Sequence, residues 1–424
     1  MRHGKWLSPL VAGMVVLLLN AGSAAAKARA EVEMEKTVIT STLTPKVIEE
    51  APGSIQVITG DDIKKMGAET AADALVDATG IDLDNVAGRG AIPQIRGMSN
   101  KRTLILIDGM RFSTGFRDTT VDLNEFPTEV IDHIEIVRGP SSSLYGGEAV
   151  GGVINIITKK APEDFQGSAG VRYGLNTYGE GDNWIGKSSM GGTLGGLGLI
   201  VAGHANIRNR FERDVNDDFT DIDDEKKFGG IVKMNYALSD DHEISGGAFI
   251  TDTNRQGIRP KYGLHWDRDA DSERFSSFFS YDGKALDMNL MARAYCSNFD
   301  LERSYIDTGE PYPTTQLQNK ARQQPDREDF DITNKLYQYE ARASRMFGGN
   351  HMITLGAEYR DEKREGVENR GESPINKSVD NSAVFFQDDF ISLDALQITA
   401  GVRLDEHSDF GSEVSPRISL VYDL

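Results

Sequence analysis

The stretch that decides the fold runs from residue 134 to residue 157 and reads IEIVRGPSSSLYGGEAVGGVINII. The strand-like run from Ile131 to Val137 predicts a strand, which ends at Arg138-Gly139-Pro140. Glycines at 146, 147, 151 and 152 follow, and they fit tight turns and close approach between backbones. An ordinary glycine-rich loop is the alternative. We expect a strand that leads into a tightly packed turn region.

The residues before this stretch extend it into a compact α/β domain over residues 51–160. Asp61 or Asp62 is expected to cap a helix there, and the Asp108-Gly109 pair predicts a turn that follows a strand. The other predicted elements are a strand over Ser54–Thr59, a helix over Asp61–Asp77 and a strand over Thr103–Ile107.

From about residue 165 the helical period disappears and apolar residues alternate with polar ones. One such stretch sets Leu355 and Tyr359 on one face and Glu358 and Arg360 on the other. Segments of about ten residues with a period of two and polar connections are typical of a transmembrane β-barrel wall, apolar outward and polar inward. A soluble β-sandwich is the alternative, because alternation alone does not say whether the apolar face meets lipid or a second sheet.

The first 26 residues predict a secretory signal peptide. A basic head is followed by an apolar run from Leu10 to Leu19 and then by small residues that end at Ala26. The apolar run is about ten residues long, which is too short for the roughly 20 residues of a spanning helix. No later segment offers eighteen uninterrupted apolar residues, so a membrane could be crossed only by strands.

The charge of the chain argues against nucleic acid as a partner. The 424 residues carry 46 basic and 66 acidic side chains, a formal net charge of −20, whereas phosphate binding needs lysine and arginine patches. The single cysteine, Cys296, excludes an intramolecular disulfide. No set of cysteines and histidines has the spacing of a zinc site.

These ordered motifs resemble those of TonB-dependent outer-membrane receptors, with the closest likeness to the colicin I receptor and cobalamin receptor branch. The plug motifs are Ile95-Arg96-Gly97, Ile107-Asp108-Gly109 and the 134–157 stretch, and residues 35–42 resemble a TonB box. Barrel-like motifs follow at 355–359, 386–389 and 401–405. The resemblance implies four parts: a signal peptide over 1–26, a periplasmic extension over 27–50, a plug over 51–160 and barrel strands over 165–424.

The resemblance also implies residues that bind TonB and residues that join plug to barrel. A β-prone TonB box can add as a strand to the edge of TonB, which can then pull on the plug. The residues expected to bind TonB are Glu35, Lys36, Thr37, Val38, Ile39, Thr40 and Ser41. Buried arginines need carboxylate partners, so ion pairs between plug and barrel are expected among Arg96, Arg138, Glu135 and Glu358. An exposed strand glutamate is the alternative for Glu358.

Clusters of cations and aromatic rings suggest where a substrate binds. Such clusters suit an anionic aromatic chelate such as a ferric catecholate, and solvated loops or lipopolysaccharide contacts are the alternative. The candidate residues are Arg89, Arg111, Phe112, Phe116 and Arg117 in the plug, with Arg255, Arg259, Tyr262 and Trp266 in the barrel. An acidic loop is a candidate calcium site, although it lacks the glycine spacing of an EF-hand. Its aspartates are Asp214, Asp217, Asp218, Asp221 and Asp223.

The function implied is energised uptake of a scarce metal chelate, most simply a ferric siderophore, across an outer membrane. Cobalamin and haem are alternative substrates. A passive pore, a surface-recognition protein and a signalling receptor are alternatives of other classes. The chain has no Walker loop, no HExxH motif and no nucleophile elbow, so we expect neither an enzyme nor a bound cofactor.

The length of the barrel region departs from the family. Residues 165–424 provide about 10 to 13 strands at roughly 20 to 25 residues each, whereas the family closes its barrel with 22. A plug of this size occupies on the order of 15,000 Å³, and a closed ring of about 12 strands would enclose only about 7,000 Å³. We therefore expect about half of a barrel, the N-terminal part of a longer receptor from a truncated or split reading frame, or a fragment without function.

Overall fold

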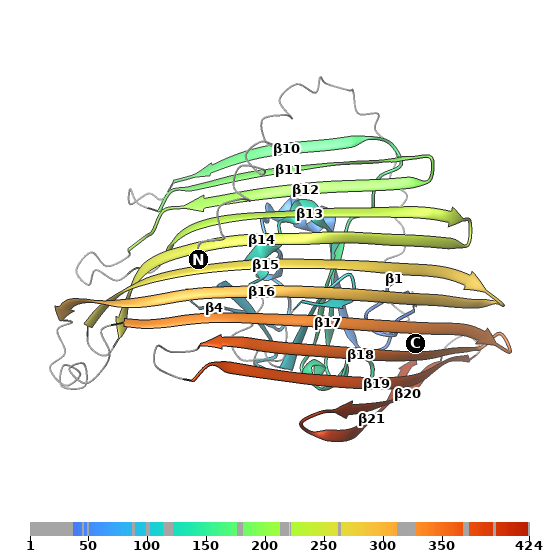
Figure 1. The fold of residues 1–424 in the computed structure, drawn as a ribbon. Coiled ribbons are helices and arrows are strands. Elements are labelled where there is room, and N and C mark those ends of the chain that lie inside the picture. The colour runs from blue at the N-terminus through green and yellow to red at the C-terminus, as the bar shows by residue number, and fades with distance from the viewer. Residues whose placement is uncertain are drawn as a thin grey trace.

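The computed structural model describes two regions that were expected from the sequence, a small α/β domain and a long antiparallel wall. The described residues are 37–44, 46–48, 51–86, 90–98, 102–112, 122–175, 181–212, 220, 222–261, 264–311, 327–367, 373–392 and 396–422. Figure 1 shows the small domain lying against the concave side of the curved wall. No helix among the described residues is long and apolar enough to cross a bilayer.

The small domain, the plug, is built around a five-stranded sheet. Its order is β3-β8-β9-β6-β7, with β6 and β9 parallel and the other pairs antiparallel. The strands are β3 (Ser54–Thr59), β6 (Thr103–Ile107), β7 (Met110–Arg111), β8 (Ile131–Arg138) and β9 (Gly152–Thr158). Both faces of the central strands are buried, which explains their nearly continuous apolar sequence.

The predicted helix over Asp61–Asp77 is wrong in one respect, because two short helices replace it. These are α2 (Gly60–Met66) and α3 (Ala71–Leu75). Gly67 ends α2 in the left-handed conformation at φ 68°, and this conformation stops the helix. The cap is Thr59 rather than Asp61 or Asp62, with Asp62 completing a reciprocal capping box.

The remaining plug elements are short and surround the sheet. They are β1 (Thr37–Val38), β2 (Lys46–Val47), β4 (Ile81–Val86), β5 (Gly90–Ile95), the 3₁₀ helices η4 (Leu123–Glu125), η5 (Thr128–Val130) and η6 (Gly147–Ala149), and α4 (Ser142–Tyr145). Within the N-terminal segment, β1 and β2 pair as a short antiparallel ladder. The β4–β5 hairpin forms a separate two-stranded sheet.

The wall is one antiparallel sheet of twelve strands, a number within the predicted range. Each strand pairs with the next in sequence, and β10 and β21 are its two edges, which do not pair with each other, so the sheet is open. The strands are β10 (Gln166–Gly174), β11 (Asn183–Leu194), β12 (Leu197–Arg208), β13 (Asp224–Ser239), β14 (His242–Lys261), β15 (Leu264–Ala285), β16 (Met288–Pro311), β17 (Arg327–Phe347), β18 (His351–Val367), β19 (Ile375–Ser392), β20 (Leu396–His407) and β21 (Gly411–Tyr422).

Side chains alternate along the wall as the sequence predicted. Leu355 and Tyr359 on β18 are exposed, at 56% and 43%, whereas their neighbours Thr354 and Glu358 are buried toward the plug. At one end of the wall the connections between strands are short, as at the Leu286–Asp287 turn. The alternation and the turns together confirm a barrel-type wall with an apolar outer face.

An aromatic seam joins the plug to the middle of the wall. It consists of Phe112 and Phe126 from the plug and Phe249 from β14, all buried. The ring centroids of Phe112 and Phe126 lie 4.5 Å apart, and those of Phe126 and Phe249 lie 5.2 Å apart. These spacings are typical of favourable aromatic contacts, so apolar burial fixes the plug here.

The outer face of the wall carries a row of carboxylates. Asp252, Glu273 and Asp300 lie directly opposite one another on β14, β15 and β16. On β15, Phe275 lies two residues from Glu273 on the same outer face and is half exposed. The outer surface therefore changes from apolar to acidic within one step along the strands.

Candidate functional site

The N-terminal box segment, residues 37–44, lies between the plug and the wall. On the plug side, the carboxylate of Glu135 accepts hydrogen bonds from the amides of Ile39, at 3.2 Å, and Thr40, at 2.8 Å. The hydroxyl of Tyr145 donates to the carbonyl oxygen of Thr40 at 3.0 Å. The side-chain amide of Asn155 donates to the hydroxyl oxygen of Thr40 at 2.8 Å.

On the wall side, the contacts go to backbone carbonyl oxygens of the box segment. Arg417 donates to Ser41 at 3.0 Å, Gln387 to Thr42 at 2.9 Å and Arg342 to Leu43 at 3.2 Å. We call the six side chains that hold the segment the box seat: Glu135, Tyr145, Asn155, Arg342, Gln387 and Arg417.

The box segment is largely buried, although its sequence predicts only a β-prone strand that can pair with TonB. Val38, Thr40 and Thr42 are buried, and the chain turns between Ile39 and Leu43. Glu35 and Lys36, which were also expected to bind TonB, lie outside the described residues.

Glu135 is ionised in this seat. Burial opposes its charge, but hydrogen bonds from His133 and from the Thr40 and Ile39 amides hold its pKa below the ordinary value. Burial also works against a charge on His133, yet its contacts with Asp132 and Glu135 raise the pKa of His133 to about 9. Glu135 therefore binds the box segment rather than forming the expected ion pair with the barrel.

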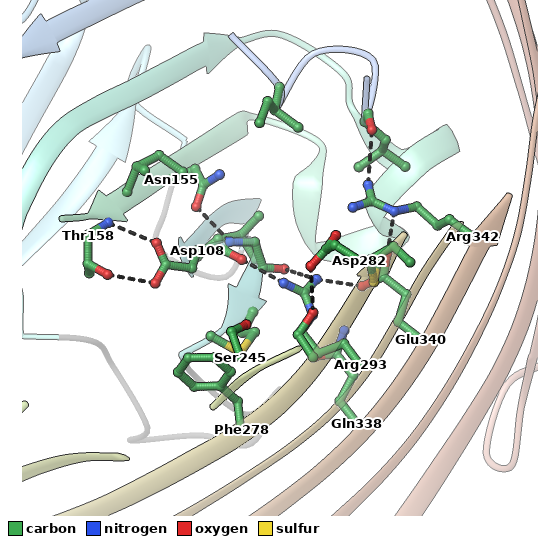
Figure 2. A pocket seen from close by; sticks show the side chains of 18 of the residues that line it. Asp108, Asn155, Thr158, Ser245, Phe278, Asp282, Arg293, Gln338, Glu340 and Arg342 are labelled. Carbon is green, nitrogen blue, oxygen red and sulfur yellow. Dashed lines mark hydrogen bonds and ion pairs between the residues drawn. The ribbon is translucent and has the colours of Figure 1, made fainter. Parts of the chain in front are cut away.

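The Asp108–Gly109 turn lies beside the box seat (Figure 2). The carboxylate of Asp108 accepts hydrogen bonds from the amide of Thr158 at 2.8 Å and from Lys233 of β13 at 2.9 Å. Arg293 of β16 donates to the carbonyl oxygens of Asp108, at 2.6 Å, and Gly109, at 3.3 Å. The turn is thus fastened to the wall from two strands.

A cavity of about 430 Å³ separates this part of the plug from the wall. Ile39 and Leu43 of the box segment form part of its lining, opposite wall residues that include Ser245 and Gln338 (Figure 2). Its lining mixes charged side chains such as Lys233 and Glu340 with apolar ones such as Met110 and Phe278. The box segment therefore borders an open space between the plug and the wall.

Arg111 and Glu358, two predicted site residues, meet in a buried charge network. Arg111 is ion-paired with Glu148, and its Nε lies 4.0 Å from Glu358. Glu358 also faces Arg403 of β20 at 3.4 Å. Glu358 therefore pairs with the plug through Arg111 and not through Arg96 or Arg138, and the registers of β18, β19 and β20 bring Arg403 to it as well.

Arg96 and Arg138 lie beside each other, but no carboxylate is within ion-pairing distance of either in the described ranges. A Cβ atom on Gly80 would contact both side chains, at 3.7 Å from Cγ of Arg96 and 3.9 Å from Nε of Arg138. Arg138 instead donates to the carbonyl oxygen of Thr79 at 2.6 Å and to the side chain of Gln56. The expected ion pairs of these arginines are not formed by described residues.

Several predicted substrate residues are occupied by protein contacts. Phe112 is in the aromatic seam, and Trp266 is buried. Arg255 is paired with Glu225 and with Asp122 of the plug. The predicted residues Arg89, Phe116, Arg117 and Tyr262 lie outside the described residues.

Arg259 and Arg268 share a single carboxylate, that of Asp223. Within the described ranges, Asp223 is the carboxylate that pairs with both guanidinium groups. On the next strand Arg303 stacks over Phe330 at 4.3 Å from the ring centroid. Cations and aromatic rings therefore do gather on the inner wall near its long connections.

The calcium hypothesis gains no support from the described part of the chain. Asp223 is engaged by arginines, and the structure places no three metal-ligating residues together in the ranges that it describes. The other candidates, Asp214, Asp217, Asp218 and Asp221, lie outside those ranges.

Sequence reasoning missed the residues that hold the box segment. Tyr145, Asn155, Arg342, Gln387 and Arg417 carry no motif of their own that predicts contact with residues 37–44. The alternation along the strands indicates only which wall side chains face inward, as for Arg293 beside the Asp108–Gly109 turn. Their partners are up to 376 positions apart in the chain, as for Ser41 and Arg417.

Known proteins share the sequence and the architecture of this chain. The iron-regulated outer membrane virulence protein of Vibrio cholerae is 28% identical to this chain. The alignment covers 98% of this chain and 61% of that protein. The vitamin B12 transporter BtuB of the same species is 26% identical over 92% of this chain and 60% of its own length. The chain thus spans about 60% of the length of these curated relatives.

A crystal structure of a mutant of the ferric enterobactin receptor PfeA from Pseudomonas aeruginosa has the same fold. It aligns with a TM-score of 0.70 at 20% identity, covering 88% of this chain and 60% of that one. The family model for the TonB-dependent receptor plug domain matches residues 47–153. The model for the TonB-dependent receptor-like β-barrel matches residues 164–424, so this chain belongs to the family of TonB-dependent receptors.

Proposed function

We propose that the chain acts in energised uptake of a scarce metal chelate across the outer membrane, driven by TonB pulling on the box segment. The observation that carries this proposal is how the segment is held. Five of the six seat residues bind its backbone amides or carbonyl oxygens, and the sixth, Asn155, binds a hydroxyl. A backbone held in this way can exchange those bonds for a strand pairing with a partner.

The substrate we favour is a ferric siderophore of the catecholate type. The two neighbouring guanidinium groups of Arg259 and Arg268 and the stacking of Arg303 on Phe330 suit an anionic aromatic chelate. The name of the iron-regulated relative from Vibrio cholerae agrees with an iron-linked role. Cobalamin is the second candidate, because a vitamin B12 transporter is almost as similar.

Membrane insertion completes the proposal. We propose that residues 1–26 are a signal peptide, that the wall lies in the outer membrane and that further strands cover the edges of β10 and β21. Uncovered edges would expose unpaired backbone groups to lipid. Each such group would cost on the order of several kcal/mol of free energy, as a buried unsatisfied amide does. Contact with lipopolysaccharide follows from the same location.

Deletion of residues 35–42 tests the uptake mechanism. We expect cells to bind a ⁵⁵Fe-labelled ferric catecholate at their surface but to accumulate none of it, because the point of attachment for TonB is lost. A deletion of the same length within residues 312–326, between β16 and β17 in the sequence, controls for a general effect on assembly. Accumulation that is unchanged by the first deletion would show a passive pore instead.

A binding comparison tests the substrate. Quenching of intrinsic tryptophan fluorescence can be titrated with ferric enterobactin, cobalamin and haemin in turn. We expect tight binding of ferric enterobactin, and weakened binding when Arg268→Met removes one guanidinium. Preferential binding of cobalamin would replace the ferric catecholate as the substrate and leave the uptake mechanism standing.

A further inference from the structure

A closed circuit of contacts joins the box segment to the Asp108–Gly109 turn. In one direction the circuit runs from Thr40 to Asn155 and from Asn155 to the amide of Gly109, at 2.8 and 3.0 Å. In the other it runs from the turn to Arg293, from Arg293 to Glu340 at 2.7 Å, and through Arg342 to Leu43. Figure 2 shows Asp108, Asn155, Arg293, Glu340 and Arg342 of this circuit around the cavity.

Asn155 stands where the circuit crosses the plug. Its side chain is buried, and the primary amide uses both of its ends, donating to Thr40 and accepting from Gly109. In the sheet it lies directly opposite Glu135, another residue of the box seat. An apolar side chain at position 155 could bind neither Thr40 nor Gly109, whereas the amide binds both at once.

The turn is close in sequence to a region expected to meet the ligand. Met110, Arg111 and Phe112 follow the turn directly, and Arg274 of β15 fixes the carbonyl oxygen of Phe112 at 3.1 Å. The predicted substrate residues Phe116 and Arg117 come next in the chain. The Asp108–Gly109 turn is therefore only a few residues away in sequence from the predicted substrate residues.

We propose that Asn155 is a positioning residue that couples the Asp108–Gly109 turn to the box segment. While the turn keeps its place against the wall, Asn155 is oriented to hold Thr40, and when the turn shifts that bond is lost and the box segment leaves its seat more often. This coupling rests on the proposed function, because it supplies the step between ligand contact in the plug and presentation of the box to TonB.

The chain offers a clean reporter for the position of the box segment. Ser41 is buried, and its hydroxyl has no hydrogen-bond partner, so Ser41→Cys replaces the side chain at little cost. The single native thiol is removed by Cys296→Ser. The rate at which a maleimide labels Cys at position 41 in the purified chain then reports how often the segment leaves its seat.

Substitutions on both sides of the bond should raise this rate. Thr40→Val and Asn155→Leu are each expected to increase labelling about fivefold to tenfold, the effect of one buried hydrogen bond of roughly 1 kcal/mol. The double variant should show little more than Asn155→Leu alone. Thr42→Val is the matched control, and its labelling rate should stay within about twofold of the parent. Among the described residues, the Thr42 hydroxyl bonds only inside the segment, to Thr44.

Lys233→Met tests the coupling itself. Lys233 holds the far side of the turn and does not contact the box segment, so its removal should raise labelling about twofold to threefold. The increase should disappear in the Thr40→Val background, where the bond from Asn155 no longer exists. Persistence of the full increase in that background would overturn the coupling.

Hydrogen exchange separates coupling from simple loss of folding. Exchange at β6 and β9 should stay unchanged in Asn155→Leu while labelling rises. If exchange rises together with labelling and Thr40→Val has no effect, Asn155 is only a structural residue and the proposal fails. None of these readouts needs TonB or a chelate, so a failure of the uptake hypothesis would leave their outcome intact, and the reverse also holds.

Discussion

The plug meets the wall in two buried regions of opposite chemistry. The aromatic seam brings Phe112, Phe126 and Phe249 together with no hydrogen bond among them. The box seat instead holds its segment through directed hydrogen bonds, most of them to backbone atoms. Apolar contact resists any displacement until the surfaces separate, whereas hydrogen bonds can be exchanged one for one with a partner or with water.

The difference teaches which part of the interface is built to stay and which to release. Burial of apolar surface has no equivalent replacement in water, so the seam anchors the plug. The net value of each hydrogen bond in the seat is only about 1 kcal/mol, so the seat can be emptied in small steps. The predictions below test whether the two regions really act independently.

The largest effect is expected in the seam. Phe126→Ala should destabilise the plug by about 3–5 kcal/mol, because a buried ring is replaced by a cavity. Faster hydrogen exchange at β6 and β9 would measure it. Phe410→Ala, at a ring that is 87% exposed, is the control and should change little. An equal loss in both variants would show that the seam is not an anchor.

The next effect is expected in the seat. Glu135→Gln removes the charge that receives the Ile39 and Thr40 amides, at a cost of about 1.5–3 kcal/mol for a charged acceptor. Labelling of Ser41→Cys should rise more than tenfold while exchange at β6 and β9 stays slow. Glu413→Gln, on the exposed edge strand β21, serves as the control. Slower labelling than in the parent would contradict a holding role for Glu135.

A smaller effect is expected just after the box segment, at Lys46. Lys46 is ion-paired with Asp389 of β19 at 3.2 Å, and both side chains are buried. Asp389 also accepts hydrogen bonds from Gln387 at 2.8 Å and Thr399 at 2.5 Å, so it keeps donors when Lys46→Met removes the cation. We expect a loss of about 1 kcal/mol, seen as roughly fivefold faster labelling. A loss of several kcal/mol would mean that Asp389 is left uncompensated.

The smallest effect concerns pH. The pKa of His133 is raised to about 9 in the folded protein from an ordinary 6.5, so its stabilising contribution is complete below pH 6.5 and is lost as the pH rises through 9. Solvent around Asp132 screens this contribution, and we expect about 1 kcal/mol. Thermal unfolding of the plug between pH 6 and pH 10 measures it. His133→Gln should flatten the profile, and a midpoint that rises with pH would contradict the assignment.

The fold followed from the sequence because its signals are local. The strand predictions over Ser54–Thr59 and Thr103–Ile107 coincide with β3 and β6. The helix prediction failed at Gly67, where the apolar period continues across a residue whose left-handed conformation ends the helix. Period reports which face is buried, but a single backbone dihedral decides where the element stops.

The site could be predicted only in part because its contacts are not local. Alternation indicated that Glu358 faces inward, but the register of three strands decides that it meets Arg403 and not Arg138. The serine and threonine residues of the box segment are polar, and no local feature of the sequence predicts their burial. They are buried because side chains 95 to 376 positions away supply their partners.

The carboxylate row on the outer face fixes the height of the protein in the bilayer. Charged groups are excluded from hydrocarbon, so the lipid boundary falls between Phe275 and Glu273. From Phe275 to the end of β15 at Ala285, ten steps along a strand tilted by about 45° span about 24 Å, close to the ~25 Å of an apolar belt. The remainder of β16, from Asp300 to Pro311, therefore projects about 25 Å past the hydrocarbon edge.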